Sequence, residues 1–372
     1  MAEGRGMGEN QAMSYKLLRP LLFRFDPERA HRWVLASLGW FGSQPELREV
    51  ITRAFCYEDP RLEQELFGLR FKNPVGLAAG FDKDARAVGG LAALGFGFLE
   101  LGSVSARPSP GNPPPRIFRL PEDRAIINRM GIPSVGADRV AERLAELEDR
   151  PLPLGVNLNF TTQAELSREE IIADYRYSLR RLYACADYLA INLSCPNLPD
   201  AEFAPTEPQD LEALLQSLAK ERGGKPLLVK LSPDLSDEEL DQVLEVAQRY
   251  VDGFIAVNTT TSREGLRTQD RRLIAQRGGL SGRPLRARAT ETISHIYRRT
   301  DGKLPIIGVG GIFSAKDAWE KLRSGASLVE IYTGLIYEGP GIVKRIDRGL
   351  VRLLEEHGYR SIAEAVGSGA RL

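Results

Sequence analysis

The sequence predicts an α/β fold, a (β/α)8 TIM barrel with a small N-terminal helical extension. Eight short apolar runs recur along the chain, and each is long enough for one buried parallel strand. Helical patterns separate most of the runs, which is the alternation that such a barrel requires. No G-x-G-x-x-G follows the first run, and this counts against an open doubly wound sheet. The runs are Val75–Leu77, Phe98–Leu101, Leu154–Leu158, Tyr188–Leu193, Leu227–Leu231, Gly253–Val257, Ile306–Gly308 and Leu328–Ile331.

Composition and charge exclude several classes of protein. The 372 residues include 50 lysines and arginines and 50 aspartates and glutamates, so no net charge favours nucleic acid. The cysteines Cys56, Cys185 and Cys195 form no close pair, so neither a disulfide framework nor a zinc ribbon is expected. None of the three histidines ends an apolar run, so we predict no metal site and an acid–base group of another residue type.

The chain divides into three predicted parts. Residues 1–13 are rich in glycine and polar residues and are expected to be disordered. Residues 14–57 are expected to form short helices, and residues 58–372 the barrel. Alternation over Leu62–Phe71 predicts a small hairpin before the first barrel strand.

The helical part has an unusually wide apolar surface. Asp26–Glu28 has the residues of a helix start, and the helix after it carries Trp33 and Trp40. This surface either docks wholly on the barrel or contacts a membrane surface. No run in the chain reaches the roughly 18 apolar residues of a membrane span.

Nearly every predicted strand ends in residues that could carry chemistry. The C-terminal ends of barrel strands meet on one face, which is where barrel enzymes have their active sites. Glycine and asparagine occur in any loop, but folding alone does not need lysines there. The clusters are Ala78–Lys83, Gly102–Ser103, Asn157, Asn192–Asn197, Lys230, Asn258–Thr260, Gly308–Gly311 and Tyr332–Gly334.

The fourth cluster, Asn192–Asn197, reads Asn-Leu-Ser-Cys-Pro-Asn after a buried strand. Proline cannot continue a central strand, so the cluster begins a loop. Cys195 is therefore a candidate base or nucleophile. A small buried thiol beside turn-forming amides is the alternative interpretation.

Glycine-rich turns follow the seventh and eighth predicted strands. Such turns, each leading into a helix, expose backbone N–H groups and form the usual phosphate site of a barrel. Gly278–Gly282 is interpreted as a third glycine-rich loop at the same corner. We therefore expect a phosphorylated cofactor with lysine and amide side chains around its ring.

Together these clusters resemble the dihydroorotate dehydrogenase family, specifically its quinone-dependent class 2. The resemblance covers the chain from about Leu18 to the C-terminus and combines motifs of the first strand, the insertion after the second strand, the flavin phosphate end and the class 2 helical extension. These motifs are Asn73–Lys83, Ile117–Asp123, Ile127–Gly131, Gly278–Leu285, Pro305–Ile312, Leu328–Gly334 and Asp26–His31.

The resemblance implies FMN-dependent oxidation of dihydroorotate to orotate, a step of de novo pyrimidine (UMP) biosynthesis, with a quinone as electron acceptor. It implies that FMN is held by Ala79, Gly80, Lys83, Ser103, Asn157, Asn192, Lys230, Val257, Gly282, Gly311, Tyr332 and Thr333. It implies that the substrate is held by Lys83, Asn128, Arg129, Met130, Gly131, Ile132, Asn192, Asn197, Asn258 and Thr259. His31 and Arg119 match positions at the quinone tunnel, and the apolar helices would contact the cytoplasmic face of a membrane.

The chemistry of these residues is consistent with that reaction. Asparagines both donate and accept hydrogen bonds, as a ring rich in carbonyl and N–H groups requires. Lys83 or Arg129 could pair with the substrate carboxylate, and Lys230 would stabilise negative charge on the flavin. Cys195 stands where class 2 has a serine base, and a thiol ionises more easily than a hydroxyl.

The chain departs from the family pattern at Ile132–Pro133, Asn159–Thr162, Leu198–Pro205 and Val257. These departures gather around the substrate, whereas the phosphate end matches closely. Two alternatives to the quinone-linked enzyme therefore stay open. One is an FMN oxidoreductase of the same barrel family that acts on another cyclic substrate, and the other is a flavin-binding paralogue without turnover.

Overall fold

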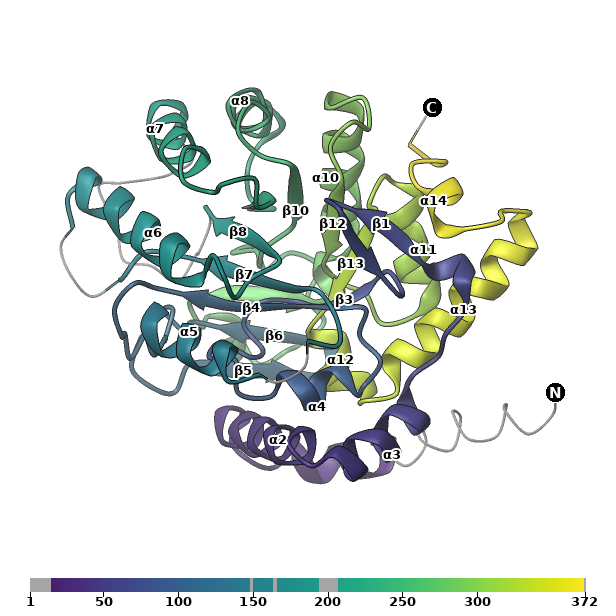
Figure 1. Ribbon diagram of the computed structural model, residues 1–372. Helices are drawn as coiled ribbons and strands as arrows, with labels where there is room; N and C mark the ends of the chain where they lie inside the picture. The colour runs from purple at the N-terminus through teal and green to yellow at the C-terminus, as the bar shows by residue number, and fades with distance from the viewer. Residues whose placement is uncertain (1–14, 148–149, 163–165, 194–206, 371–372) are drawn as a thin grey trace.

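The computed structural model describes residues 15–147, 150–162, 166–193 and 207–370. Eight parallel strands close into a barrel in the order in which they occur along the chain (Figure 1). The predicted barrel is therefore confirmed, and each predicted run is one of its strands. The strands are β3 (Val75–Leu77), β4 (Phe98–Val104), β7 (Leu154–Leu158), β8 (Tyr188–Asn192), β9 (Leu227–Leu231), β10 (Gly253–Ala256), β12 (Ile306–Val309) and β13 (Leu328–Ile331).

Helices surround the barrel, and local sequence accounts for where several of them begin. Ser167 and Ser236 each cap a helix through a capping box with the glutamate three residues later. The longer helices are α5 (Ala137–Ala145), α6 (Arg168–Leu182), α7 (Pro208–Ala219), α8 (Asp237–Ala247), α10 (Arg286–Arg299), α11 (Ala315–Arg323) and α13 (Ile342–His357). The short ones are α4 (Val88–Ala92), α9 (Arg271–Ile274), α12 (Thr333–Glu338) and α14 (Ile362–Ala365).

The helix that follows β3, α4, begins only at Val88, after a turn at the end of the strand. The buried Asp82 carboxylate accepts the backbone N–H groups of Arg86 and Ala87 at 2.9 and 2.8 Å. These bonds hold the preceding residues in a turn and keep Lys83 at the rim of the barrel.

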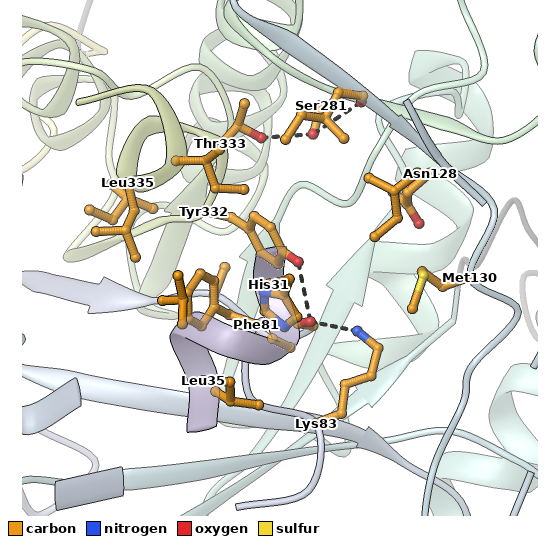
Figure 2. A pocket seen from close by; sticks show the side chains of 18 of the residues that line it. His31, Leu35, Phe81, Lys83, Asn128, Met130, Ser281, Tyr332, Thr333 and Leu335 are labelled. Atoms are coloured by element: carbon orange, nitrogen blue, oxygen red, sulfur yellow. Dashed lines mark hydrogen bonds between the residues drawn. The ribbon is translucent and has the colours of Figure 1, made fainter. Parts of the chain in front are cut away.

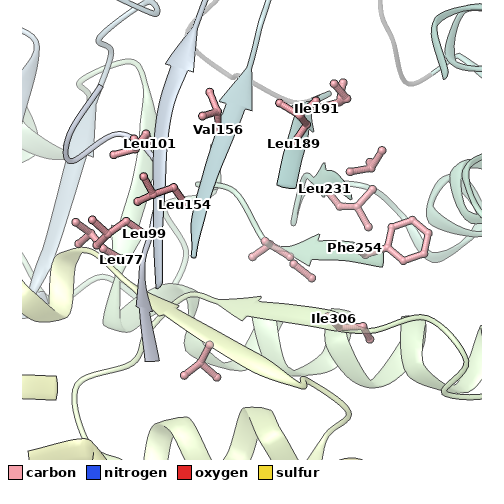
Figure 3. Packing of buried hydrophobic residues seen from close by; sticks show 14 of the residues in the cluster. Leu77, Leu99, Leu101, Leu154, Val156, Leu189, Ile191, Leu231, Phe254 and Ile306 are labelled. Atoms are coloured by element: carbon pink, nitrogen blue, oxygen red, sulfur yellow. The ribbon is translucent and has the colours of Figure 1, made fainter. Parts of the chain in front are cut away.

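Two apolar layers stabilise the barrel. Outward-pointing residues such as Leu99, Leu154 and Leu189 pack between the strands and the helices (Figure 3). Inward-pointing residues form a second cluster, which includes Phe98 and the Phe71 ring 5.4 Å away. Phe71 ends the predicted hairpin, confirmed as β1 (Gln64–Leu66) and β2 (Leu69–Phe71), which closes the amino-terminal end of the barrel.

A separate three-stranded antiparallel sheet covers part of the opposite end. It consists of β5 (Ile117–Leu120), β6 (Ala125–Asn128) and β11 (Gly279–Gly282). The interpretation of Gly278–Gly282 as a loop was therefore wrong, because all but its first residue forms β11 and pairs with β6. At Gly282, with φ +104°, a Cβ atom would lie 2.4 Å from the Arg124 carbonyl oxygen, so glycine permits this close pairing.

The N-terminal extension consists of a helix over residues 15–22, α2 (Pro27–Gly42) and α3 (Pro45–Phe55), and it lies beside α4 (Figure 1). Asp26 caps α2 as predicted, accepting the Arg29 N–H at 2.9 Å. A two-bond ion pair between Glu28 and Arg116, with atoms 2.7 and 3.0 Å apart, fastens α2 to the chain before β5.

Only part of the apolar surface of the extension docks, so the expectation that it docks wholly on the barrel is wrong. Its docked face includes the buried Ala30 and Leu35. The extension also carries most of the large apolar side chains that are exposed among the described residues. These are Leu17, Leu18, Leu21, Phe25, Trp33, Val34, Trp40, Leu47 and Val50. In the described part of the chain, no helix has the length and hydropathy needed to cross a membrane.

Candidate active site

One cavity of about 1030 Å³ lies among the carboxyl ends of the barrel strands, the three-stranded sheet and the N-terminal extension. It brings together residues from every group that the sequence singled out. The predicted FMN residues in its wall are Ala79, Gly80, Lys83, Ser103, Asn157, Asn192, Lys230, Val257, Gly282, Gly311, Tyr332 and Thr333. The predicted substrate and quinone residues in its wall are Asn128, Met130, Gly131, Ile132, Asn258, Thr259, His31 and Arg119.

Three of the predicted site residues are not among the described residues of the cavity wall. Cys195 and Asn197 lie outside the described residues. Arg129 is described, but its guanidinium donates to Gln276 and to the Pro115 carbonyl at 2.6 and 2.9 Å and is not in the cavity wall. Arg129 is therefore not placed to pair with a ligand in the cavity.

A chain of polar side chains crosses the floor of the cavity from strand to strand. Asn157 donates to the Glu100 carboxylate at 3.1 Å and accepts from the Ser103 hydroxyl at 2.5 Å. Asn192 donates to the same hydroxyl at 3.4 Å, and Asn258 donates to the Asn192 side chain at 3.2 Å. These bonds fix which atoms of each amide are directed toward a ligand.

The buried ammonium group of Lys230 is held by two carboxyl groups. Its Nζ atom is 2.9 Å from Glu100 Oε1 and 3.7 Å from Glu330 Oε2, and both glutamates are fully buried. Burial alone would lower the pKa of Lys230, but the two carboxyl groups outweigh burial and raise it. Lys230 therefore presents a positive charge at the floor of the cavity.

The part of the cavity wall after β12 and β13 is built from glycine turns and hydroxyl groups. Gly311 has φ +72°, and a Cβ atom there would lie 2.4 Å from the Arg286 side chain, so only glycine fits. Ser281 and Thr333 also line the cavity, and their hydroxyl groups lie 2.7 Å apart (Figure 2). This part of the cavity therefore combines small side chains, two hydroxyl groups and glycine backbone, which are groups suited to a phosphate.

Lys83 and an aromatic cluster connect the cavity floor to the N-terminal extension (Figure 2). Lys83 Nζ donates to the Gly80 carbonyl at 2.5 Å, and the Tyr332 hydroxyl donates to the same oxygen at 3.3 Å. The Phe81 ring meets the His31 ring edge-on at 4.9 Å and the Tyr332 ring at 5.6 Å. His31 on α2 therefore contacts the segment that carries Gly80 and Lys83.

His31 is held neutral where it docks. Burial, and then the nearby Lys83 ammonium, lower the pKa of His31 from 6.5 to about 4. Arg119 also lines the cavity beside the extension, where it donates to the Phe25 carbonyl at 2.9 Å and stacks on the Phe23 ring. Burial lowers the pKa of Arg119 as well.

The docking of α2 is expected to weaken as the pH falls, because the docked His31 resists protonation. A histidine with a lowered pKa contributes its full stabilisation above its free pKa of 6.5 and loses it between pH 6.5 and about 4. The whole loss is about 3 kcal/mol. Limited proteolysis of residues 15–55 should accelerate below pH 6, and His31→Gln should abolish this acceleration whereas His295→Gln should retain it.

Sequence reasoning missed three buried residues of this site. Glu100 and Glu330 lie inside predicted apolar strands, and a carboxyl group within a buried strand is a signal that could have revealed them. The Tyr175 hydroxyl on α6 lies 3.2 Å from both the Asn159 side-chain oxygen and the Asn192 carbonyl oxygen, and no local pattern marks it. Among the described residues no group of histidine, cysteine, aspartate and glutamate could hold a metal ion.

Comparisons with known proteins match the chain along most of its length. A family model described as dihydroorotate dehydrogenase matches residues 61–354. A relative from Gloeobacter violaceus named dihydroorotate dehydrogenase (quinone) is 49% identical over 354 residues, which are 95% of this chain and 98% of the relative. One of the same name from Acidithiobacillus ferrooxidans is 46% identical and is covered over its whole length. The solved structure of a DHODH from Eimeria tenella in complex with ferulenol matches with a TM-score of 0.81 and 36% identity, over 93% of this chain and 96% of that one.

Proposed function

The chain belongs to the dihydroorotate dehydrogenase family, and from this premise we propose that it oxidises dihydroorotate to orotate with FMN as cofactor and a quinone as electron acceptor. The observation that carries this proposal is that one cavity combines polar and charged residues from the barrel strand ends with apolar residues from the helices of the extension. The names of the relatives favour this reading over the two alternatives that the sequence left open.

The described residues suit FMN. A cavity of about 1030 Å³ is large enough for a nucleotide-sized ligand together with a small substrate. The glycine and hydroxyl end, with Gly311 and Thr333, would hold the phosphate, and the buried Lys230 would lie at the ring. Because a Cβ atom at Gly311 has no room, larger side chains would disrupt this end of the site.

The chain's own part in the reaction is to orient the substrate and to remove one proton. When bound, FMN accepts the hydride that leaves the ring of dihydroorotate. We assign removal of the proton on the adjacent ring carbon to the Cys195 thiolate, on the evidence of its sequence motif. Loss of one hydride and one proton leaves the ring double bond of orotate.

Amides and one lysine are proposed to orient the pyrimidine. Asn128, Asn192 and Asn258 line the cavity and can donate to carbonyl groups and accept from N–H groups of the ring. Lys83 lines the cavity whereas Arg129 is engaged elsewhere, so Lys83 is the cation that we propose for the substrate carboxylate.

The simplest test of the substrate is a bleaching experiment. Purified protein that contains FMN is mixed with dihydroorotate without oxygen, and flavin absorbance is followed. Rapid bleaching is expected with dihydroorotate. Protein that binds FMN and does not bleach would contradict the proposed substrate, and protein that fails to bind FMN would contradict the proposed cofactor.

We propose that quinone enters the cavity beside His31 and Arg119, and that the exposed apolar side chains of the extension contact a membrane surface. A quinone is apolar and is dissolved in lipid, so its route to the cavity should begin at an apolar surface. Leu17 is 78% exposed and Trp40 is 59% exposed, and such exposed apolar side chains gain free energy when lipid covers them.

Removing these side chains is expected to release the protein from lipid. Leu17→Ser and Trp40→Ser should each weaken binding to phospholipid vesicles by about tenfold or more, since each loses roughly 1.5–3 kcal/mol of apolar burial. Vesicle co-sedimentation measures the change. Tyr177→Ser, which alters an exposed aromatic residue on α6, is the matched control and should bind as the unaltered protein does. Equal loss in the control, or none in the two variants, would contradict the proposed contact.

A further inference from the structure

Glu330 is a buried carboxyl group that borders the cavity and has no part in the chemistry described above. It lies on β13, two residues before Tyr332, and its side chain is fully buried. Neither of its oxygen atoms has a hydrogen-bond partner among the described residues. An ionised carboxylate in such a position would be strongly unfavourable without a close counter-charge.

The positive charge of Lys230 lies closer to Glu100 than to Glu330. Lys230 Nζ is 2.9 Å from Glu100 Oε1 but 3.7 Å from Glu330 Oε2, so it forms a hydrogen bond with Glu100 and not with Glu330. Glu100 Oε1 also accepts from the Asn157 amide at 3.1 Å. Negative charge is therefore better stabilised on Glu100 than on Glu330.

Within the described part of the chain, Glu330 has no ion pair with a second cation. Tyr188 on β8 is fully buried, and its hydroxyl has no hydrogen-bond partner in the described part of the chain. The strands that flank β13, β12 and β3, carry no ionisable residue. Burial, followed by the proximity of Glu100, raises the pKa of Glu330 well above its ordinary value.

We propose that Glu330 carries a proton in the folded protein, so that the cluster of Glu100, Lys230 and Glu330 has no net charge. The consequence for catalysis rests on the proposed function. A neutral cluster leaves the Lys230 ammonium able to stabilise negative charge that develops on a flavin ring in the cavity. An ionised Glu330 would give the cluster a net negative charge and would oppose this stabilisation of the flavin ring. Glu330 acts through Lys230 and is therefore a positioning residue.

Infrared spectroscopy tests the proton directly. A protonated buried carboxyl group has a C=O stretching band, sensitive to deuterium exchange, that an ionised carboxylate lacks. The unaltered protein should show such a band at neutral pH that is missing from Glu330→Gln. Asp347→Asn is the matched control, because Asp347 on α13 is another fully buried carboxyl group whose pKa burial raises well above its ordinary value. That variant should lose a different band and keep the band of Glu330.

A second variant tests which of the two glutamates, Glu100 or Glu330, carries the proton. In Glu100→Gln, Glu330 becomes the carboxyl group of the cluster that must balance Lys230, so it should ionise and its C=O band should disappear although the residue is still present. A band that persists in Glu100→Gln would overturn the proposed distribution, in which Glu100 carries the negative charge and Glu330 the proton. A band absent from the unaltered protein, or unchanged in Glu330→Gln, would overturn the proposed proton.

The reduction potential of bound FMN is a second readout that separates a protonated Glu330 from an ionised one. Because glutamine replaces one neutral group by another, Glu330→Gln should leave the potential at pH 7 unchanged. A clear rise would mean that a negative charge had been removed and would contradict the proposal. The infrared result does not require turnover of dihydroorotate, so it still decides the state of Glu330 if the proposed substrate is wrong.

Discussion

Replacing Cys195 by alanine is expected to slow the reduction of bound flavin by dihydroorotate by about 10²–10⁴-fold, the usual contribution of a general base. FMN should stay bound, because the cavity residues proposed to hold it are elsewhere in the chain. Anaerobic stopped-flow measurement of flavin absorbance gives the rate. Flavin content after gel filtration shows whether the cofactor is retained.

Two further cysteine variants make this test specific. Cys185→Ala alters a buried thiol behind the barrel strands and should reduce at the unaltered rate, apart from any loss of stability. Cys195→Ser retains a group that can lose a proton but ionises less easily than a thiol, so its rate should be lower and should rise at higher pH. Unchanged reduction in Cys195→Ala would mean that another residue is the base.

Replacing Lys230 by methionine is expected to lower the free energy of unfolding by about 3–5 kcal/mol at pH 7, because it leaves the buried carboxylate of Glu100 without its cation. Urea unfolding of the FMN-free protein measures this loss. The same variant should bind FMN weakly, since the positive charge at the cavity floor is gone.

The matched control is Lys303→Met, which breaks an exposed ion pair with Asp301 and should change stability by about 0–1 kcal/mol. Combining Lys230→Met with Glu100→Gln should restore part of the lost stability, because one unpaired carboxyl group is then removed. Equal stability of Lys230→Met and Lys303→Met would show that the buried cluster does not depend on its ammonium group.

The barrel could be predicted because its signals are local. Each strand buries both of its faces, so its apolar run stands out in the sequence, and the capping residues Ser167 and Ser236 mark helix starts. The polar residues at the strand ends could be predicted as one site because a closed barrel brings those ends together.

Features that depend on distant partners could not be predicted in the same way. Gly279–Gly282 has the composition of a loop and becomes a strand only because β6 pairs with it. The cluster of Glu100, Lys230 and Glu330 joins three strands whose facing residues are known only once the barrel is closed. Arg129 follows a residue of the cavity wall, yet its side chain is held by Gln276 from another segment.

Anaerobic double mixing of the FMN-containing protein is the most direct measurement of the proposed reaction. The protein is first mixed with dihydroorotate until the flavin is bleached, and then with a soluble quinone, fumarate or NAD in separate experiments. Bleaching by dihydroorotate followed by rapid recovery of flavin absorbance with quinone, and not with fumarate or NAD, is the expected result. Absence of bleaching, or recovery with fumarate or NAD but not with quinone, would contradict a quinone-linked oxidation of dihydroorotate.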